Sequence, residues 1–422
     1  MSKKTNLFHK DFVMVIICQI ISLFGNGILR FALPLYILNE SGSPVLFGLV
    51  SAAAFVPMIL MNLCGGIIAD RVNKQKIMVF LDVATAGAMF CFILLSGWFS
   101  IVPLIVIVLM IIYGVQGAYQ PTVQSCLPLL MVRENLTPSN AVINLVISLS
   151  QQLLGPVIGG VLFGFYGLLP VVYISAGCFA ASAILAFFIK IPNIHIVEEG
   201  SALQIIKRDM TTSFKYIIVE NPVIFKVTLL FFFANICLSS LLTVGIPVIV
   251  TNYLDLSNQL YGLANGALAA GGVAGGLFAG FFGKKVDIKY AYVYLIIGAI
   301  GLLPMAAALF LGLPTMVTFV IIAISSFITM FGTQTFTIQK YAFIQAQAPV
   351  EIIGKVLSCI MALCLCAQPI GQALYGVLFE KFIDSPAIII AIASVVALTM
   401  TIVSKSIFKQ LKETETEHRM AS

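Results

Sequence analysis

The stretch Gly66-Ile-Ile-Ala-Asp70-Arg71-Val-Asn73-Lys74 decides the fold, because it is a short charged segment between two long apolar runs. The flanking runs, residues 45–69 and 77–99, both exceed the about 20 apolar residues that a helix needs to cross a bilayer. Two spanning helices joined by a tight basic loop predict a membrane protein that crosses the bilayer several times.

Ten further apolar runs of similar length follow the same plan. They cover residues 12–38, 101–124, 139–164, 168–189, 224–250, 259–282, 290–312, 314–338, 356–379 and 386–408. Hydrophobic residues make up 60% of the 422-residue chain and charged residues only 9%, against roughly 45–50% and about 25% in soluble domains. This balance excludes a soluble enzyme, a nucleic-acid-binding protein and a disordered chain. Long continuous runs also exclude β-barrel strands, which are short and alternating.

We therefore predict an all-α membrane protein with 12 transmembrane helices in two pseudo-symmetric six-helix bundles. The longest polar stretch, residues 191–221, separates an N-terminal bundle over 1–190 from a C-terminal bundle over 222–408 and a cytoplasmic tail over 409–422. Within this linker, Ser201–Val219 has apolar residues at helical spacing, which favours a helix on the membrane surface over a merely solvated segment.

The basic residues predict the orientation. With a cytoplasmic N-terminus, all but two of the 23 Lys and Arg residues fall on the cytoplasmic side, the exceptions being Arg30 and Lys381. Because basic loops stay in the cytoplasm, we expect both termini there and the protein in the cell (plasma) membrane.

The two halves also resemble each other. Tyr113-Gly-Val-Gln116 has a counterpart in Phe331-Gly-Thr-Gln334, and Pro156 with Gly159 has one in Pro369 with Gly371. Duplicated halves are typical of secondary transporters, which bind their substrate near the midplane between the repeats.

These motifs resemble the major facilitator superfamily over the full length of the chain. Residues 66–74 are similar to its signature loop between helices 2 and 3, with Asn73 at the usual second glycine and Gln75 at a basic position. Gly155-Pro156-Val-Ile-Gly159-Gly160 is similar to the motif of exporters that run as antiporters, with Gln151 replacing an upstream glycine. Gln116-Gly117 fits a further motif, with Tyr113 at its arginine position.

Within the superfamily the chain resembles the drug:proton antiporter branch of macrolide-efflux and siderophore-export proteins. This likeness rests on Phe31-Ala-Leu-Pro34-Leu, Ala69-Asp70-Arg71, Asp82, Tyr119-Gln-Pro121, Leu127-Pro128-Leu129-Leu130 and Asn140-Ala141. It implies a secondary-active exporter of amphipathic, macrolide-like drugs that uses proton antiport and alternating access. Export of a dedicated solute, such as a siderophore or lysolipid, is the alternative, and a non-transporting membrane scaffold is the alternative from another class.

The signature loop is expected to control conformational change. Gly66 allows close helix packing, and the resemblance places Asp70 near the start of helix 11 around 351–355. Arg71 and Lys74 can pair with acids or lipid phosphates. The glycine-rich motif of helix 5, with Gly155, Pro156, Gly159 and Gly160, is expected to contribute to the same switching.

Two charges, Arg30 and Asp82, are predicted inside the spans, where each needs a partner or water. Arg30 either faces a central cavity and meets an anionic group, or extends to the outer interface. Asp82 either pairs with a loop cation or carries the proton. Asp70, Asp82 and Glu134 are the nearest titratable candidates for coupling.

Neutral polar residues at helical spacing form stripes on several predicted helices. The resemblance implies that helices 1, 4, 7 and 10 line the pathway. The candidate pathway residues are Gln19, Asn26, Arg30, Gln116, Gln120, Asn235, Ser239 and Gln334. The alternative is that these side chains form hydrogen bonds between helices. Small residues on helix 8, which are Gly262, Gly266 and Ala270 and then Gly272, Gly276 and Gly280, predict a helix-packing surface.

No cluster of His, Cys, Asp or Glu in the spans fits an enzyme or a metal site, so we expect neither catalysis nor a cofactor. An ion channel would lack the duplicated exporter motifs. The expected partners are a small-molecule substrate, protons and membrane lipids, with no nucleic acid, and we expect a monomer.

The loop motif gives a first testable prediction. Asp70→Asn should leave the protein in the membrane but abolish transport, because the helix-end contact that switches conformation loses its charge. Substrate export by cells with matched membrane levels of the two proteins measures this. Wild-type export by the variant would contradict it.

Overall fold

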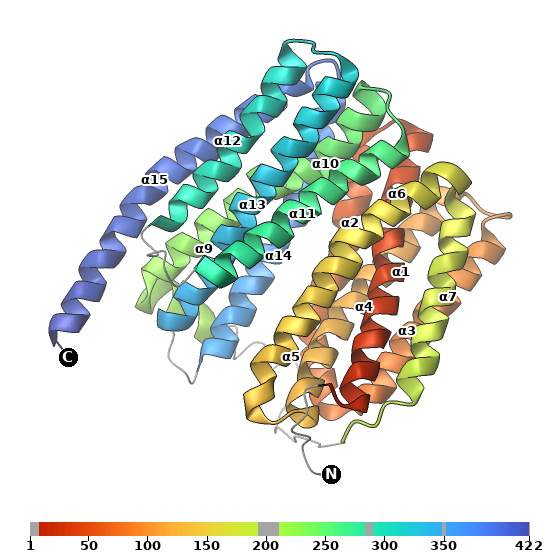
Figure 1. The fold of residues 1–422 in the computed structure, drawn as a ribbon, viewed down its shortest axis with the longest axis horizontal. Coiled ribbons are helices and arrows are strands. Elements are labelled where there is room, and N and C mark those ends of the chain that lie inside the picture. The colour runs from red at the N-terminus through yellow and green to blue at the C-terminus, as the bar shows by residue number, and fades with distance from the viewer. Residues whose placement is uncertain (1–7, 193–210, 283–289, 348–351, 422) are drawn as a thin grey trace. The chain divides into compact units, whose positions relative to one another are not determined.

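The computed structural model describes residues 8–192, 211–282, 290–347 and 352–421, and every element in these ranges is helical (Figure 1). The predicted all-α membrane fold is confirmed. The predicted surface helix lies partly outside the described residues, and its last nine residues, 211–219, are helical.

The described residues of the first half of the chain form seven α-helices and one π-helical segment. They are α1 (Lys10–Ser41), α2 (Pro44–Arg71), α3 (Lys74–Leu95), α4 (Ile101–Leu130), α5 (Arg133–Val146), η1 (Ile147–Leu154), α6 (Gly155–Tyr166) and α7 (Leu168–Phe187). The segments α5, η1 and α6 follow one another without a break, so they form the single predicted span around 139–164.

The second half repeats the plan. Its elements are η2 (Tyr216–Glu220), α9 (Pro222–Ala234), η3 (Asn235–Ser240), α10 (Leu241–Pro247), η4 (Val248–Tyr253), α11 (Asn258–Phe282), α12 (Ala291–Phe310), α13 (Thr315–Gln347), α14 (Ile353–Lys381) and α15 (Pro386–Ala421). The π-helical segments η3 and η4 lie within one continuous span, α9 to η4. Such segments are uncommon and often mark functional sites.

Eleven helical spans in the described residues are long and apolar enough to cross a membrane. The twelfth predicted span is α15, whose apolar part, Pro386–Ile402, is shorter. Large apolar side chains point outward along these helices, among them Phe80, which is 69% exposed, and Phe310, which is 80% exposed. Soluble proteins rarely expose so much apolar surface, whereas lipid covers it in a membrane protein.

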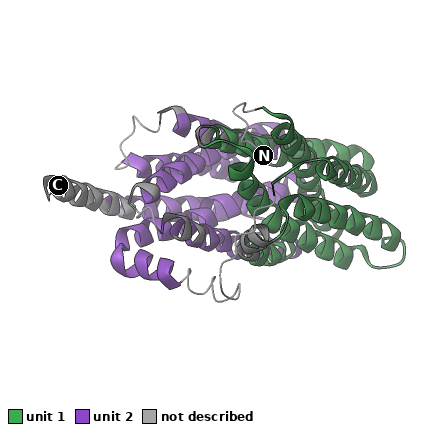
Figure 2. Ribbon diagram, turned by 90° about the horizontal axis from the view of Figure 1, so that it is seen from below, with its two compact units in different colours: residues 1–42, 50–202, 257–262 green, residues 43–49, 203–256, 263–422 purple. Residues whose placement is uncertain are grey.

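Figure 2 colours the two compact units of the chain. Unit 1 comprises residues 1–42, 50–202 and 257–262, and unit 2 comprises residues 43–49, 203–256 and 263–422. In unit 1, α1 packs against α4, η1, α6 and α7, and α3 packs against α4 and α7. In unit 2, α12 packs against α13 and α15, and α14 packs against η3, α9 and α10.

The predicted packing surface of α11 is close to a neighbour only in its first part, where a Cβ at Gly262 would lie 3.0 Å from the Gly160 Cα of α6.

The second part of α11 packs on a different face from the predicted one. A Cβ at Gly272 or Gly280 would meet nothing within 4 Å, and one at Gly276 would only touch a flexible side chain. The close contacts in this part are made by Gly271 and Gly275, whose Cβ atoms would lie 2.2 Å and 2.4 Å from carbonyl oxygens of α13. Small residues occur on several faces of α11, so spacing alone pointed to the wrong one.

This packing predicts opposite effects for one substitution at two adjacent positions. Gly271→Ala should destabilise the protein by about 1–3 kcal/mol, because the added Cβ overlaps backbone that cannot move aside. Gly272→Ala should be neutral or stabilising by up to about 1 kcal/mol, because alanine favours the helix and the site is open. Thermal unfolding of the purified variants measures the difference. Equal unfolding temperatures would contradict the packing.

Candidate functional site

Three side-chain amides join three helices of unit 1. The side chains of Gln116 on α4 and Gln151 in η1 form a reciprocal pair, with two N–H···O contacts of 2.8 Å each. Gln151 Nε2 also donates to Asn26 Oδ1 on α1, at 3.1 Å. Asn26 and Gln116 are buried. The predicted pathway residues Asn26 and Gln116 therefore meet in one network, and both of the predicted uses, pathway and helix contact, remain open to them.

Close backbone packing makes this network possible. A Cβ at Gly27 would lie 2.9 Å from the carbonyl oxygen of Gln151, and one at Gly155 would lie 2.8 Å from the Gly27 Cα. Gly159 packs against Ile28 in the same way, at 3.3 Å. Since only glycine permits such an approach, the helix 5 motif holds α6 and η1 against α1. Pro156 and Gly160 of the motif are also buried.

Arg30 lies at one end of the amide network. Its guanidinium carbon is 3.7 Å from the centre of the Tyr113 ring, and its Nη1 donates to Gln116 Oε1. Arg30 forms no ion pair with a described residue. A cation–π contact contributes about 0.5–2 kcal/mol, and a hydrogen bond to a charged group about 1.5–3 kcal/mol. Removing a cation from water costs several kcal/mol, so an anion beside Arg30 would be stabilising.

Two further predicted pathway residues have amides without a partner. Both polar atoms of Gln19 on α1 and of Gln120 on α4 are buried and make no hydrogen bond. Gln19 lies seven residues, about two turns, before Asn26, and Gln120 lies one turn after Gln116. Because buried amides are rarely left unsatisfied, these atoms are positions where water or a ligand could bind.

Asp82 is bound by two hydroxyl groups. Its carboxyl accepts a hydrogen bond from Ser22 on α1 at 2.8 Å and from Ser182 on α7 at 2.6 Å. The side chain is fully buried, and no described residue forms an ion pair with it. The packing of α3 places Asp82 between α1 and α7, and its pairing with a loop cation stays a prediction.

Unit 2 carries a second amide contact of the same kind. Gln368 Nε2 on α14 is 3.5 Å from Asn235 Oδ1 in η3, and Gln368 also lies beside Ser240. Gly371 permits this approach, because a Cβ there would lie 2.4 Å from the Ser240 side chain. Of the other predicted pathway residues, Ser239 is buried and Gln334 is half-buried.

Lys340 is a further buried charge, which the sequence placed in a cytoplasmic loop. The helix α13 continues to Gln347, well beyond the predicted end at residue 338, so Lys340 falls within a candidate span. Lys340 is only 1% exposed. The signal that could have found it is the polar spacing Gln334, Thr337, Lys340, which continues the helix 10 stripe past the last apolar run.

The signature loop is described only in part. The side chains of Gly66, Asp70 and Arg71 lie outside the described residues, and their roles stay predictions, as does the pairing of Asp70 near 351–355. Lys74 is buried. The departures from the family pattern have local uses: Asn73 caps α3 by accepting from the Gln75 and Lys76 amides, and the Gln75 side chain donates to the last carbonyls of α7.

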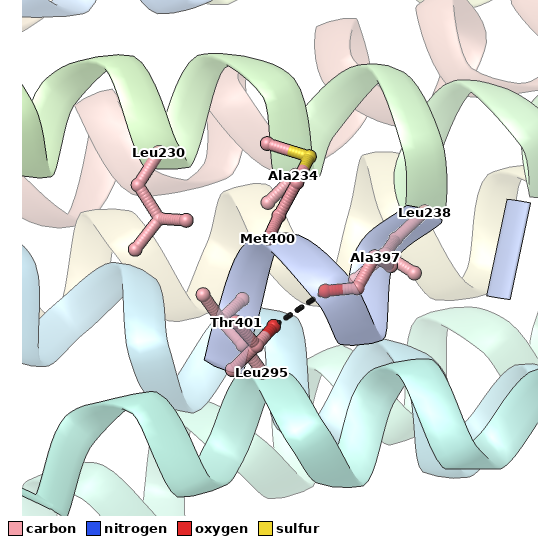
Figure 3. Close-up of a pocket in the computed structure, with 7 residues that line it drawn as sticks. All are labelled: Leu230, Ala234, Leu238, Leu295, Ala397, Met400 and Thr401. Atoms are coloured by element: carbon pink, nitrogen blue, oxygen red, sulfur yellow. Dashed lines mark hydrogen bonds between the residues drawn. The ribbon is translucent and has the colours of Figure 1, made fainter. Parts of the chain in front are cut away.

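A small cavity in unit 2 is apolar. Figure 3 shows its lining residues, which are Leu230, Ala234, Leu238, Leu295, Ala397, Met400 and Thr401. The Thr401 hydroxyl is satisfied by the Ala397 carbonyl of its own helix, at 2.6 Å. The cavity therefore offers no polar group to a ligand, and it is a packing gap between α9, η3, α12 and α15.

Curated relatives match nearly the whole chain at low identity. Macrolide efflux protein A of Streptococcus pyogenes is 22% identical over 413 residues, which covers 93% of this chain and 96% of that protein. The enterobactin exporter EntS of Citrobacter koseri is 24% identical over 382 residues, or 87% of this chain and 85% of that protein.

Solved structures show the same fold. A bacterial homolog of the human lysosomal transporter Spinster superposes with a TM-score of 0.70 at 14% identity, covering 94% of this chain and 95% of that one. A D-xylose–proton symporter gives a TM-score of 0.70 at 15% identity, covering 92% and 96%.

The helical spans, the buried polar groups between them and the shared fold agree with the family comparison, in which residues 15–358 match the Major Facilitator Superfamily. The resemblance drawn from the sequence motifs is confirmed, and the chain belongs to this superfamily of membrane transporters.

Proposed function

We propose that this protein is a secondary-active exporter of amphipathic small molecules that works by proton antiport and alternating access. The observation that carries the proposal is Arg30, a cation inside a membrane span that contacts the Gln116 amide and the Tyr113 ring and no acidic group of the described residues. Relatives named as macrolide and siderophore exporters support the export direction. We further propose that the protein is a monomer in the plasma membrane, with both termini in the cytoplasm.

The polar groups of unit 1 suit a cargo with hydrogen-bonding groups on an apolar body. Gln19 and Gln120 offer unpartnered amides, and Tyr113 offers an aromatic face. Ligand sites commonly combine an apolar wall with a few polar groups in this way.

A dedicated exporter of an anionic solute, such as a siderophore, is the second candidate. It is favoured by the absence of an acidic partner for Arg30 among the described residues, since an anionic cargo would supply the missing charge. A cationic drug would meet repulsion at the same position.

Asp82 is our candidate for the proton-coupling group. An ionised carboxylate that is fully buried without a cation is costly, and taking up a proton would remove that cost. Its neighbours on the packed helices are Ser22 and Cys18 of α1, Tyr119 of α4 and Ser182 of α7, all of them uncharged in their ordinary forms.

Whole-cell accumulation tests the function. In an efflux-deficient host, the protein should lower accumulation of a macrolide, a cationic dye, a catecholate siderophore or a lysolipid relative to vector, and a protonophore should reverse the effect. Arg30→Gln should weaken export of anionic compounds by about tenfold, since a charged hydrogen bond is lost, whereas Arg30→Lys should retain part of it. Unchanged accumulation of every compound, with the protein present in the membrane, would favour a different solute or a non-transporting role.

Proteoliposomes with an imposed pH gradient test the coupling. Asp82→Asn should abolish accumulation driven by the gradient while downhill transport continues, because the amide cannot take up and release a proton. Asp11→Asn is the matched control, since Asp11 is a buried acid at the start of α1 that accepts from the Lys190 backbone amide. Normal gradient-driven transport by Asp82→Asn would show that another group carries the proton.

A further inference from the structure

The Lys340 ammonium group is buried in unit 2 without an anion. Its Nζ lies 3.3 Å from the centre of the Phe231 ring on α9 and 4.0 Å from the centre of its neighbour, the Tyr341 ring. The only other recorded contact is with the Cys364 thiol on α14, at 3.8 Å. Among the described residues, no carboxylate pairs with it.

Aromatic rings and a thiol hold a cation without neutralising it. Ring faces attract a cation through their electron density, and one ammonium proton can be directed at the weakly accepting Cys364 sulfur, but the other two have no acceptor among the described residues. A lysine kept merely to fill space would be replaced by an apolar residue without loss, since unpaired buried charge does not stabilise a fold. The position is therefore suited to an anion that is present only part of the time.

Uncharged polar groups continue from Lys340 along the helices. Asn235 donates to the backbone carbonyl of Phe231, the residue beneath the ammonium group, at 2.9 Å. Gln368 lies one turn after Cys364 on α14 and contacts Asn235. A ligand bound at Lys340 would thus have amide groups within the same few turns and an aromatic surface beside it.

The pairing of a cation with an aromatic ring also occurs in unit 1, but there the first and fourth spans exchange roles. In unit 1 the cation Arg30 is on the first span and lies over Tyr113 of the fourth span. In unit 2 the cation Lys340 is on the fourth span of its half and lies over Phe231 of the first. In both units a glutamine of the fifth span, Gln151 or Gln368, contacts an asparagine of the first.

We propose that Lys340 is a second anion-binding residue of the transporter, which contacts a carboxylate, sulfonate or phenolate of an amphipathic aromatic cargo. The Phe231 and Tyr341 rings would contact the aromatic body of that cargo, and Asn235 and Gln368 its polar substituents. The proposal rests on the proposed export function and narrows it to organic anions.

Two fluorescent probes that share an aromatic body test the site by equilibrium binding to the purified protein in lipid nanodiscs. Anilinonaphthalene sulfonate carries an anionic group, whereas N-phenyl-1-naphthylamine has the same rings without it. The wild-type protein should bind the sulfonate about tenfold or more tightly than the amine. Lys340→Gln and Lys340→Met should lose this preference while binding the amine as before, and Lys340→Arg should retain it.

Lys381→Gln is the matched control, because Lys381 is an exposed lysine of α14 whose ammonium also lies near a ring, that of Phe382 at 5.9 Å. It should keep the wild-type preference. An equal loss of both probes in the Lys340 variants would overturn the anion site and indicate a structural role. If the Lys340 variants keep the preference for the sulfonate but lose protonophore-sensitive export, the anion site would be overturned and a role of Lys340 in proton transfer would be indicated. A wild-type protein without preference would also overturn it.

Export relative to vector separates this inference from the proposed function. If the wild-type protein exports a compound but the purified Lys340→Gln variant keeps the sulfonate preference, the proposed export function is supported and the anion site at Lys340 is rejected. Absence of any export by the wild-type protein would instead count against the exporter itself.

Discussion

The direct contact between the backbones of α1 and the η1–α6 segment is the constraint on which the rest of unit 1 depends. Gly27 and Gly155 allow this contact, and no residue with a side chain could take their places without moving a helix. The contact brings Asn26 within hydrogen-bonding distance of Gln151, which in turn pairs with Gln116 and so reaches Arg30. In a membrane the hydrophobic effect does little to hold helices together, so close packing and hydrogen bonds share that task. The glycine motif therefore positions polar chemistry as well as packing helices.

Both units hold a cation by the same physical means. Arg30 and Lys340 lie against aromatic rings, which offset part of the free energy of desolvating the cation without neutralising its charge. Asp82 is treated differently, because two serine hydroxyls donate to it. The buried acid is thus satisfied by hydrogen bonds, whereas the half-buried Arg30 and the buried Lys340 keep unused donors. This asymmetry is the basis for assigning proton transfer to the acid and cargo recognition to the bases.

Most of the fold could be predicted from the sequence, because apolar runs of membrane-spanning length and the repeated motifs leave few alternatives. The family resemblance was confirmed for the same reason. The site was predicted less completely. Helical spacing could predict that Asn26, Gln116 and Arg30 belong to one polar network. It could not predict the hydrogen-bond partners of Asp82, because spacing does not reveal which neighbouring helix a side chain faces. Lys340 was missed because a hydropathy run ends at the first charge, although the helix itself continues to Gln347. The same limit led to the wrong glycine face in the second part of α11, at Gly272, Gly276 and Gly280.

The π-helical segment η1 has a consequence for how the chain tolerates changes in length. A π-helical turn holds one residue more than an α-helical turn, so a single deletion within Ile147–Leu154 could be absorbed by reversion to α-helix. Everything after such a deletion would therefore keep its orientation, whereas a deletion from the α-helical segment α5 would rotate everything after it by about 100°, the angle between successive residues of an α-helix. After the deletion in α5, Gly155 would face away from Gly27, and a bulky neighbour would be driven into α1. The extra residue of η1 is thus one that this span could lose without turning the antiporter-like motif away from α1.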